Sequence, residues 1–116
     1  MTEEVKANPN CIVKAFENNP IAILHEEINN KKEYYFKAID VAKVLGISQI
    51  RSSIQNFDDD EKVVRKVDDL RGVAQDTSFL TSRGVYRLLY NSKKEVAKKF
   101  RKWAGNILDD IIFNES

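Results

Sequence analysis

The stretch YFKAIDVAKVLGIS, residues 35–48, contains the point at which the hydrophobic pattern changes from that of a strand to that of a helix. The aromatic pair that opens it is typical of strands. The apolar residues of 41–45 recur as on one face of a short helix, and Asp40 precedes them where the helix dipole favours an acid. Gly46 follows, at the position where helices commonly end on a left-handed glycine. A strand, a short helix and a turn are therefore expected in succession.

A second helix is expected from Gln49 to Phe57, with Ser48 as its N-cap and one apolar stripe through Ile50 and Ile54. Two helices joined by a tight turn resemble a helix-turn-helix, whose second helix enters the major groove of DNA. A helix pair that merely covers a sheet has the same spacing, so both interpretations stay open. If the pair reads DNA, the outward residues contact bases, since Arg suits guanine and Gln or Asn suits adenine. These predicted base contacts are Gln49, Arg51, Ser52, Gln55 and Asn56.

The region before this stretch predicts a small antiparallel meander. Residues 1–11 are polar and are expected to form a flexible N-terminal segment. Short apolar runs separated by Asn-rich turns then indicate three consecutive strands. The strands are expected at residues 12–16, 21–28 and 34–36, with turns at 18–20 and 29–31.

The region after it predicts a hairpin and two more helices. Val63, Arg65 and Val67 occupy alternate positions as in a half-buried strand, and 78–80 offer a partner strand. Ser82 is expected to cap a helix over 83–90. The last helix carries a continuous apolar stripe, with Leu108 and Ile112 lying off it. That stripe consists of Val96, Phe100, Trp103, Ile107 and Ile111. The fold class is therefore α+β, with antiparallel hairpins packed against about four helices in one domain over 12–116.

The charge totals conceal an uneven distribution. The 116 residues carry 19 Lys and Arg against 18 Asp and Glu, a net charge of +1. Seven Lys and Arg lie between Arg87 and Lys102, where the single acid is Glu95. The basic outer face of the last two helices and the hairpin predicted around residues 62–71, which also carries Lys and Arg, are predicted to contact DNA phosphates. The predicted phosphate contacts are Lys62, Arg65, Lys66, Arg71, Arg83, Arg87, Lys94, Lys98, Arg101 and Lys102.

The composition argues against several classes of protein. A single His and a single Cys do not suffice for a typical zinc site, and no Gly-rich phosphate loop occurs. His25 is interpreted as a strand histidine, and the run Asp58–Glu61 as a solvated loop. We therefore expect no catalytic residue, no metal, no cofactor and no small-molecule substrate.

The location is also constrained. The chain has neither a run of 18 apolar residues nor a secretory signal at its start, so it is expected to contact no membrane and not to be secreted. Cys11, the single cysteine, fits a reducing compartment. An intracellular location, in the bacterial or host-cell cytoplasm or nucleus, is expected.

These segments resemble the Bro N-terminal domain of phage antirepressors and of proteins of large DNA viruses. The resemblance extends from Phe16 to Ile111 and rests on two motifs in the same order, residues 35–47 and the sequence FLTSRGVYRLL at 79–89. The family is described as DNA-binding with an α+β fold, and the resemblance implies both properties. It assigns no catalytic residue. Val85 replaces the usual Leu of the second motif, and Asp109 stands where many members have a proline.

Two functions follow from these observations. The first is a DNA-binding domain of viral or prophage type that acts in transcription regulation on double-stranded DNA. The second is a protein-interaction module, such as an antirepressor that binds a repressor without touching DNA. The second function, or a homodimer, predicts an exposed apolar patch near the C-terminus formed by Leu108, Ile112 and Phe113.

Overall fold

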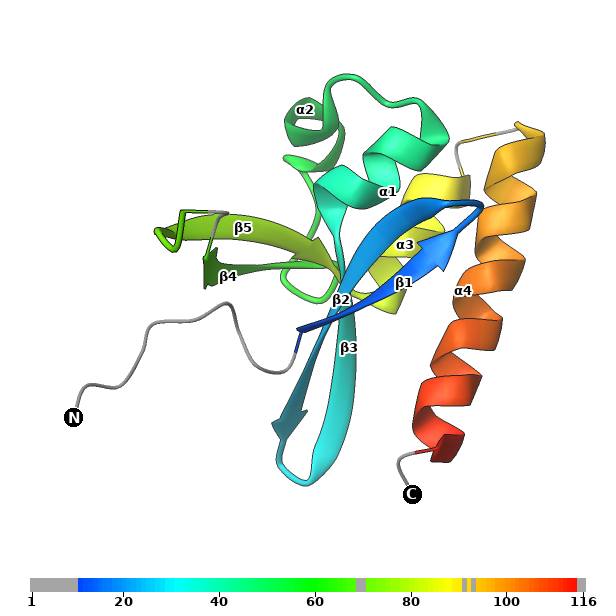
Figure 1. The fold of residues 1–116 in the computed structure, drawn as a ribbon. Helices are drawn as coiled ribbons and strands as arrows, with labels where there is room; N and C mark the ends of the chain where they lie inside the picture. The colour runs from blue at the N-terminus through cyan, green and yellow to red at the C-terminus, as the bar shows by residue number, and fades with distance from the viewer. Residues whose placement is uncertain (1–10, 69–70, 91, 93, 115–116) are drawn as a thin grey trace.

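The computed structural model describes residues 11–68, 71–90, 92 and 94–114, with side chains only as far as residue 109. Most of the predicted N-terminal segment therefore lies outside the described residues. The elements follow the expected α+β order (Figure 1). In chain order they are β1 (Cys11–Phe16), β2 (Asn19–Ile28), β3 (Lys31–Lys37), α1 (Ala38–Leu45), α2 (Ile50–Ile54), β4 (Lys62–Asp68), β5 (Ala74–Leu80), α3 (Ser82–Tyr90) and α4 (Glu95–Asn114).

The strands form a single antiparallel sheet in the order β1-β2-β3-β5-β4. The predicted meander and the predicted hairpin are both confirmed, and the structure adds the pairing of β3 with β5 that joins them. This join consists of two residue pairs, Phe36 with Leu80 and Lys37 with Phe79. The β2–β3 and β4–β5 hairpins extend from it in different directions (Figure 1).

Paired left-handed residues make the two turns of the meander. Glu17 and Asn18 have φ of 49° and 71°, and Asn29 and Asn30 have φ of 53° and 66°. Two successive positive φ values are typical of the type I′ turn, whose twist matches that of the flanking strands. Asn tolerates this conformation well, and the second turn falls where its signal predicts it. The first turn lies earlier than the predicted 18–20, because Asn19 and Pro20 already belong to β2.

The main core lies between one face of the sheet and the helices. Phe36 and Phe100 are fully buried there, and Phe16 meets Phe100 edge to face with ring centroids 5.2 Å apart. The predicted stripe of α4 therefore points inward. Trp103, also on the stripe, packs on this cluster and donates from Nε1 to the Ala15 carbonyl at 3.0 Å. The fifth member, Ile111, lies outside the described side chains.

The opposite face of the sheet has a small core of its own. Leu24, Tyr35 and Phe79 are buried together there. Across this face the Arg65 guanidinium donates to both carboxylate oxygens of Glu26, the longer hydrogen bond measuring 3.0 Å. Because Glu26 belongs to β2 and Arg65 to β4, this ion pair connects the two hairpins. It also raises the pKa of Arg65, since the hydrogen bond to Glu26 stabilises the charged form.

The helix boundaries near the turns need two corrections. α1 ends as predicted, with Gly46 at φ 74° donating its N–H to the Ala42 carbonyl. α2, however, covers only Ile50–Ile54 and has no side-chain cap, so the predicted helix 49–57 capped by Ser48 was too long. For α3, Thr81 Oγ1 rather than Ser82 accepts the Gly84 N–H, at 3.2 Å.

None of the helices in the described residues is both long and apolar enough to cross a bilayer.

Gly84 is predicted to be essential for the fold, because a Cβ there would lie 2.0 Å from the Glu61 carbonyl oxygen. The Gly84→Ala variant should lose about 2 kcal/mol or more of unfolding free energy in urea denaturation, despite the better helix propensity of Ala. Gly105→Ala is the matched control, since a Cβ at that helical position meets no atom within 4 Å. It should gain about 0.5–1 kcal/mol. Equal stabilities of the two variants would contradict the close approach.

Candidate nucleic-acid interface

The five predicted base contacts are all exposed, on α2 and on the residues that flank it. Arg51 and Ser52 belong to the helix, Gln49 precedes it, and Gln55 and Asn56 follow its end at Ile54. Ile54 is buried in the main core and anchors the helix. The row of polar side chains therefore begins just before α2 and extends past its end into the turn at residues 55–56.

A cleft of about 280 Å³ separates α2 from the β4–β5 hairpin. Arg51 lines it from the side of α2, and Asp76 and Ser78 line it from β5. α2 and β5 therefore lie side by side, although β4 and its turn lie between them in the sequence. This proximity was not evident from the spacing of the apolar residues.

The basic residues of the hairpin divide between its two faces. Lys66 pairs with Asp76 at 2.8 Å, so it lies on the face that α2 approaches. Arg65, its neighbour along β4, points to the opposite face because successive side chains of a strand alternate. Since Glu26 already holds its guanidinium, Arg65 does not share a surface with α2. Arg71 is exposed in the turn that leads into β5.

Two lysines lie at the ends of the helix pair. Lys62 donates from Nζ to the Ile54 carbonyl at 3.0 Å, at the end of α2. Lys94 reaches the Leu45 carbonyl with Nζ at 3.4 Å, at the end of α1. Cations are favourable at the C-terminal end of a helix, where the helix dipole is negative. The exposed residues Gln49, Arg51, Ser52, Gln55 and Asn56, together with Lys62, Lys66, Arg71 and Lys94, are called the α2 surface below.

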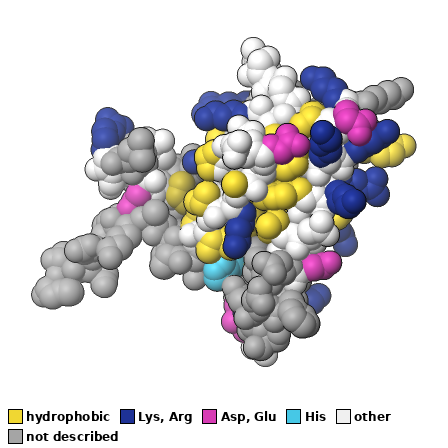
Figure 2. Space-filling view, turned by 45° about the vertical axis from the view of Figure 1, so that its right-hand side comes forward, with side chains coloured by type: hydrophobic (Ala, Val, Ile, Leu, Met, Phe, Trp, Pro, Cys, Tyr) yellow, Lys and Arg dark blue, Asp and Glu magenta, His cyan; other side chains and the backbone are white. Residues whose placement is uncertain are grey.

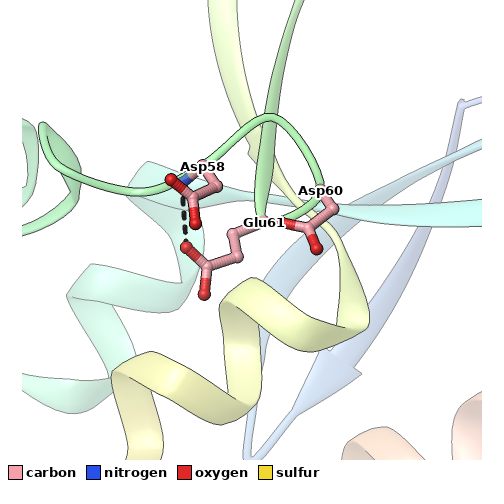
Figure 3. Close-up of side chains that lie close together, drawn as sticks. All are labelled: Asp58, Asp60 and Glu61. Atoms are coloured by element: carbon pink, nitrogen blue, oxygen red, sulfur yellow. Dashed lines mark hydrogen bonds between the residues drawn. The ribbon is translucent and has the colours of Figure 1, made fainter.

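The acidic run is largely exposed, as expected of a solvated loop, and two of its carboxylates also form ion pairs with α3. Arg83 pairs with Asp60 at 2.9 Å, and Arg87 pairs with Glu61 while its guanidinium lies 4.5 Å from the centre of the Phe57 ring. The carboxylates of Asp58, Asp60 and Glu61 lie within 4.8 Å of one another, and Glu61 accepts the Asp58 N–H (Figure 3). Since arginines of α3 neutralise two of these carboxylates, the group fastens the loop to α3.

The cations of α4 face another part of the molecule. Lys98, Arg101 and Lys102 are exposed and line a hollow with Tyr86 of α3. Figure 2, which brings the α4 side forward, shows Lys and Arg concentrated on its right-hand side. The structure therefore divides the predicted phosphate contacts between the α2 surface and the α3–α4 side, leaves Arg65 on the opposite face of the sheet, and does not assemble them on one face.

The apolar patch predicted near the C-terminus consists of Leu108, Ile112 and Phe113, and the structure describes the side chain of Leu108 alone among them. Leu108 is half-buried and packs against the main core, so only part of its side chain is available for such a patch. Ile112 and Phe113 lie outside the described side chains.

The single histidine and the single cysteine both lie in the strands of the meander. His25 is half-buried beside Tyr34, with ring centroids 6.1 Å apart. Burial raises the pKa of the Cys11 thiol. A raised pKa keeps this thiol protonated and a poor nucleophile.

Comparison with known proteins gives a family. An uncharacterized protein of Haemophilus influenzae is 25% identical over 88 residues, which are 76% of this chain and 42% of that protein. The chain thus spans less than half the length of this relative. No solved structure matches it. Residues 24–109, from β2 into α4, match the BRO family, N-terminal domain. Because this match covers most of the chain, including both helices of the candidate interface, the protein belongs to the BRO family through its N-terminal domain.

Proposed function

We propose that this chain is an intracellular DNA-binding domain of viral or prophage type that regulates transcription and holds double-stranded DNA on the α2 surface. The observation that carries the proposal is the row of five exposed polar residues on and around α2, beside a basic hairpin. A helix anchored by one apolar residue can present its other side to a groove of the duplex.

The chemistry of this row suits base edges. Arg51 can donate two parallel hydrogen bonds to guanine, and Gln55 and Asn56 can each pair with adenine through one donor and one acceptor. A five-residue helix presents few side chains, so the residues that follow it contribute as much as the helix does. The β4–β5 hairpin would lie along the neighbouring phosphate backbone.

Cations at the end of α2, on the hairpin and at the end of α1 would hold phosphates. Lys66 forms an exposed ion pair with Asp76, and such pairs contribute about 0–1 kcal/mol, so phosphate can replace the carboxylate. Lys62, Arg71 and Lys94 complete the set. Arg87 is less suitable, because its pair with Glu61 is less exposed than that of Lys66, whereas the pair of Arg83 with Asp60 is exposed to a similar degree.

The second candidate is a protein-interaction module without DNA contact. The exposed apolar residues Ile39 and Val64, 48% and 53% accessible, favour it. Ile39 lines the cleft beside α2, and Val64 lies opposite Ser78 on the hairpin. The two functions differ in their salt dependence, since apolar contacts respond weakly to salt and phosphate contacts respond strongly.

Duplex binding is predicted to weaken steeply with salt. If Lys62, Lys66, Arg71 and Lys94 neutralise about four phosphates, log K should fall against log salt with a slope of about −3.6. Fluorescence anisotropy on a labelled duplex at several salt concentrations measures this slope. An affinity that stays constant across the series would rule out phosphate binding and favour the second candidate.

Base reading is predicted to depend on Arg51. Selection of bound duplexes from a random pool should enrich a sequence for the unaltered protein, and Arg51→Ala should lose about 1–3 kcal/mol of discrimination at one guanine position. Lys102→Ala is the matched control, because it removes a cation outside the α2 surface. It should leave the enriched sequence unchanged. If Arg51→Ala enriches the same sequence as strongly, the bases are read elsewhere.

A further inference from the structure

A groove between α3 and α4 combines aromatic, apolar and basic groups. Tyr86 and Tyr90, one turn apart on α3, form one wall, and Lys98 and Arg101 of α4 form the other. Leu89 and Ala97, both buried, close the floor with Ser92 at one end. The groove has a volume of about 300 Å³, and a shallower hollow continues from it along α4 past Lys102.

The fold does not require the tyrosines of this groove to be exposed. Tyr90 is 88% accessible and Tyr86 46%, so their rings contribute little to the core. The Arg101 guanidinium lies 6.0 Å from the centre of the Tyr86 ring, which holds a cation at the rim. Tyrosine and arginine side by side around a small pocket are typical of the residues that dominate protein–protein binding energy.

The charge of the groove is strongly one-sided. Three cations, Lys98, Arg101 and Lys102, border it, and among the described lining residues the single acid is Asp109, at the far end of the shallow hollow. Asp60 and Glu61 of the 58–61 loop are paired with Arg83 and Arg87 on another side of α3. The groove therefore attracts an acidic ligand, and its aromatic walls accept an apolar group.

We propose that the α3–α4 groove binds an acidic segment of a partner protein. One apolar or aromatic side chain of that segment inserts between Tyr86 and Tyr90, and its flanking carboxylates pair with Lys98 and Arg101. A DNA duplex fits less well, because its bases are stacked inside and its phosphates cannot fill the apolar floor. This inference is independent of the α2 surface, with which the groove shares no residue.

The test is a titration followed by ¹H–¹⁵N NMR of the whole chain with a synthetic probe, the peptide Asp-Glu-Asp-Trp-Glu-Asp-Glu. The amide signals that move should be those of the groove, centred on Tyr86, Tyr90, Lys98 and Arg101. Two altered peptides test the two chemistries: Ser in place of Trp should weaken binding, and Lys in place of every acid should abolish it.

Substitutions in the chain separate the groove from general charge attraction. Tyr90→Ala, at a highly exposed site that spares the core, should weaken the peptide by about fivefold or more. Arg101→Glu should weaken it by about tenfold. Lys43→Glu, a charge reversal at an exposed site on α1, is the matched control and should change the affinity less than twofold, a change of roughly 0.4 kcal/mol.

Three results would overturn the proposal. The first is that the probe moves no signals of the groove. The second is that Lys43→Glu weakens binding as much as Arg101→Glu does, which would indicate nonspecific attraction. The third is that single-stranded oligothymidylate occupies the groove more tightly than the peptide, which would make the groove a nucleic-acid site.

Discussion

The two residue pairs that join β3 to β5 hold the rest of the structure in place. Phe36, Leu80 and Phe79, three of the four residues in this join, are fully buried, so its hydrogen bonds are shielded from water. α1 begins directly after β3, and α3 begins two residues after β5 ends. Both helices therefore leave the sheet at the join, and their relative position depends on it. The close approach of Gly84 to the Glu61 backbone fixes α3 against the start of β4.

Charged residues in this protein serve two purposes that the net charge does not distinguish. Arg65, Arg83 and Arg87 are paired with carboxylates on other elements, and these pairs connect hairpin to hairpin and loop to helix. The Arg65 pair is bidentate and half-buried, the geometry in which an ion pair contributes most. The proposed functions rest on exposed cations around α2 and along α4.

The division of these cations follows from how the helices pack. α1 lies between α2 and α4 and contacts both, so the outward sides of α2 and α4 point in different directions (Figure 1). A domain built this way has room for two ligands, DNA at the α2 surface and an acidic protein segment at the α3–α4 groove. Neither proposed site blocks the other, because the helix between them contributes mainly to the core.

The sequence alone was sufficient for the features that depend on neighbouring residues. The strands of the meander, the left-handed glycine after α1, the inward stripe of α4 and the family itself are all readable from local patterns, since periodicity and turn chemistry act over a few residues. The two errors in helix boundaries are also local. α2 ends early because the chain turns at Ile54, and Thr81 caps α3 because its hydroxyl reaches the Gly84 N–H.

Only the tertiary structure decided which charged side chains remain available. The partners of Arg65, Arg83 and Arg87 lie 39, 23 and 26 residues away in the sequence, and no local pattern specifies such pairs. The same holds for the join of β3 to β5, for the cleft between α2 and the hairpin, and for the burial of Leu108. Each depends on segments that meet only after the sheet has folded, because hydrogen bonds and ion pairs require contact in space.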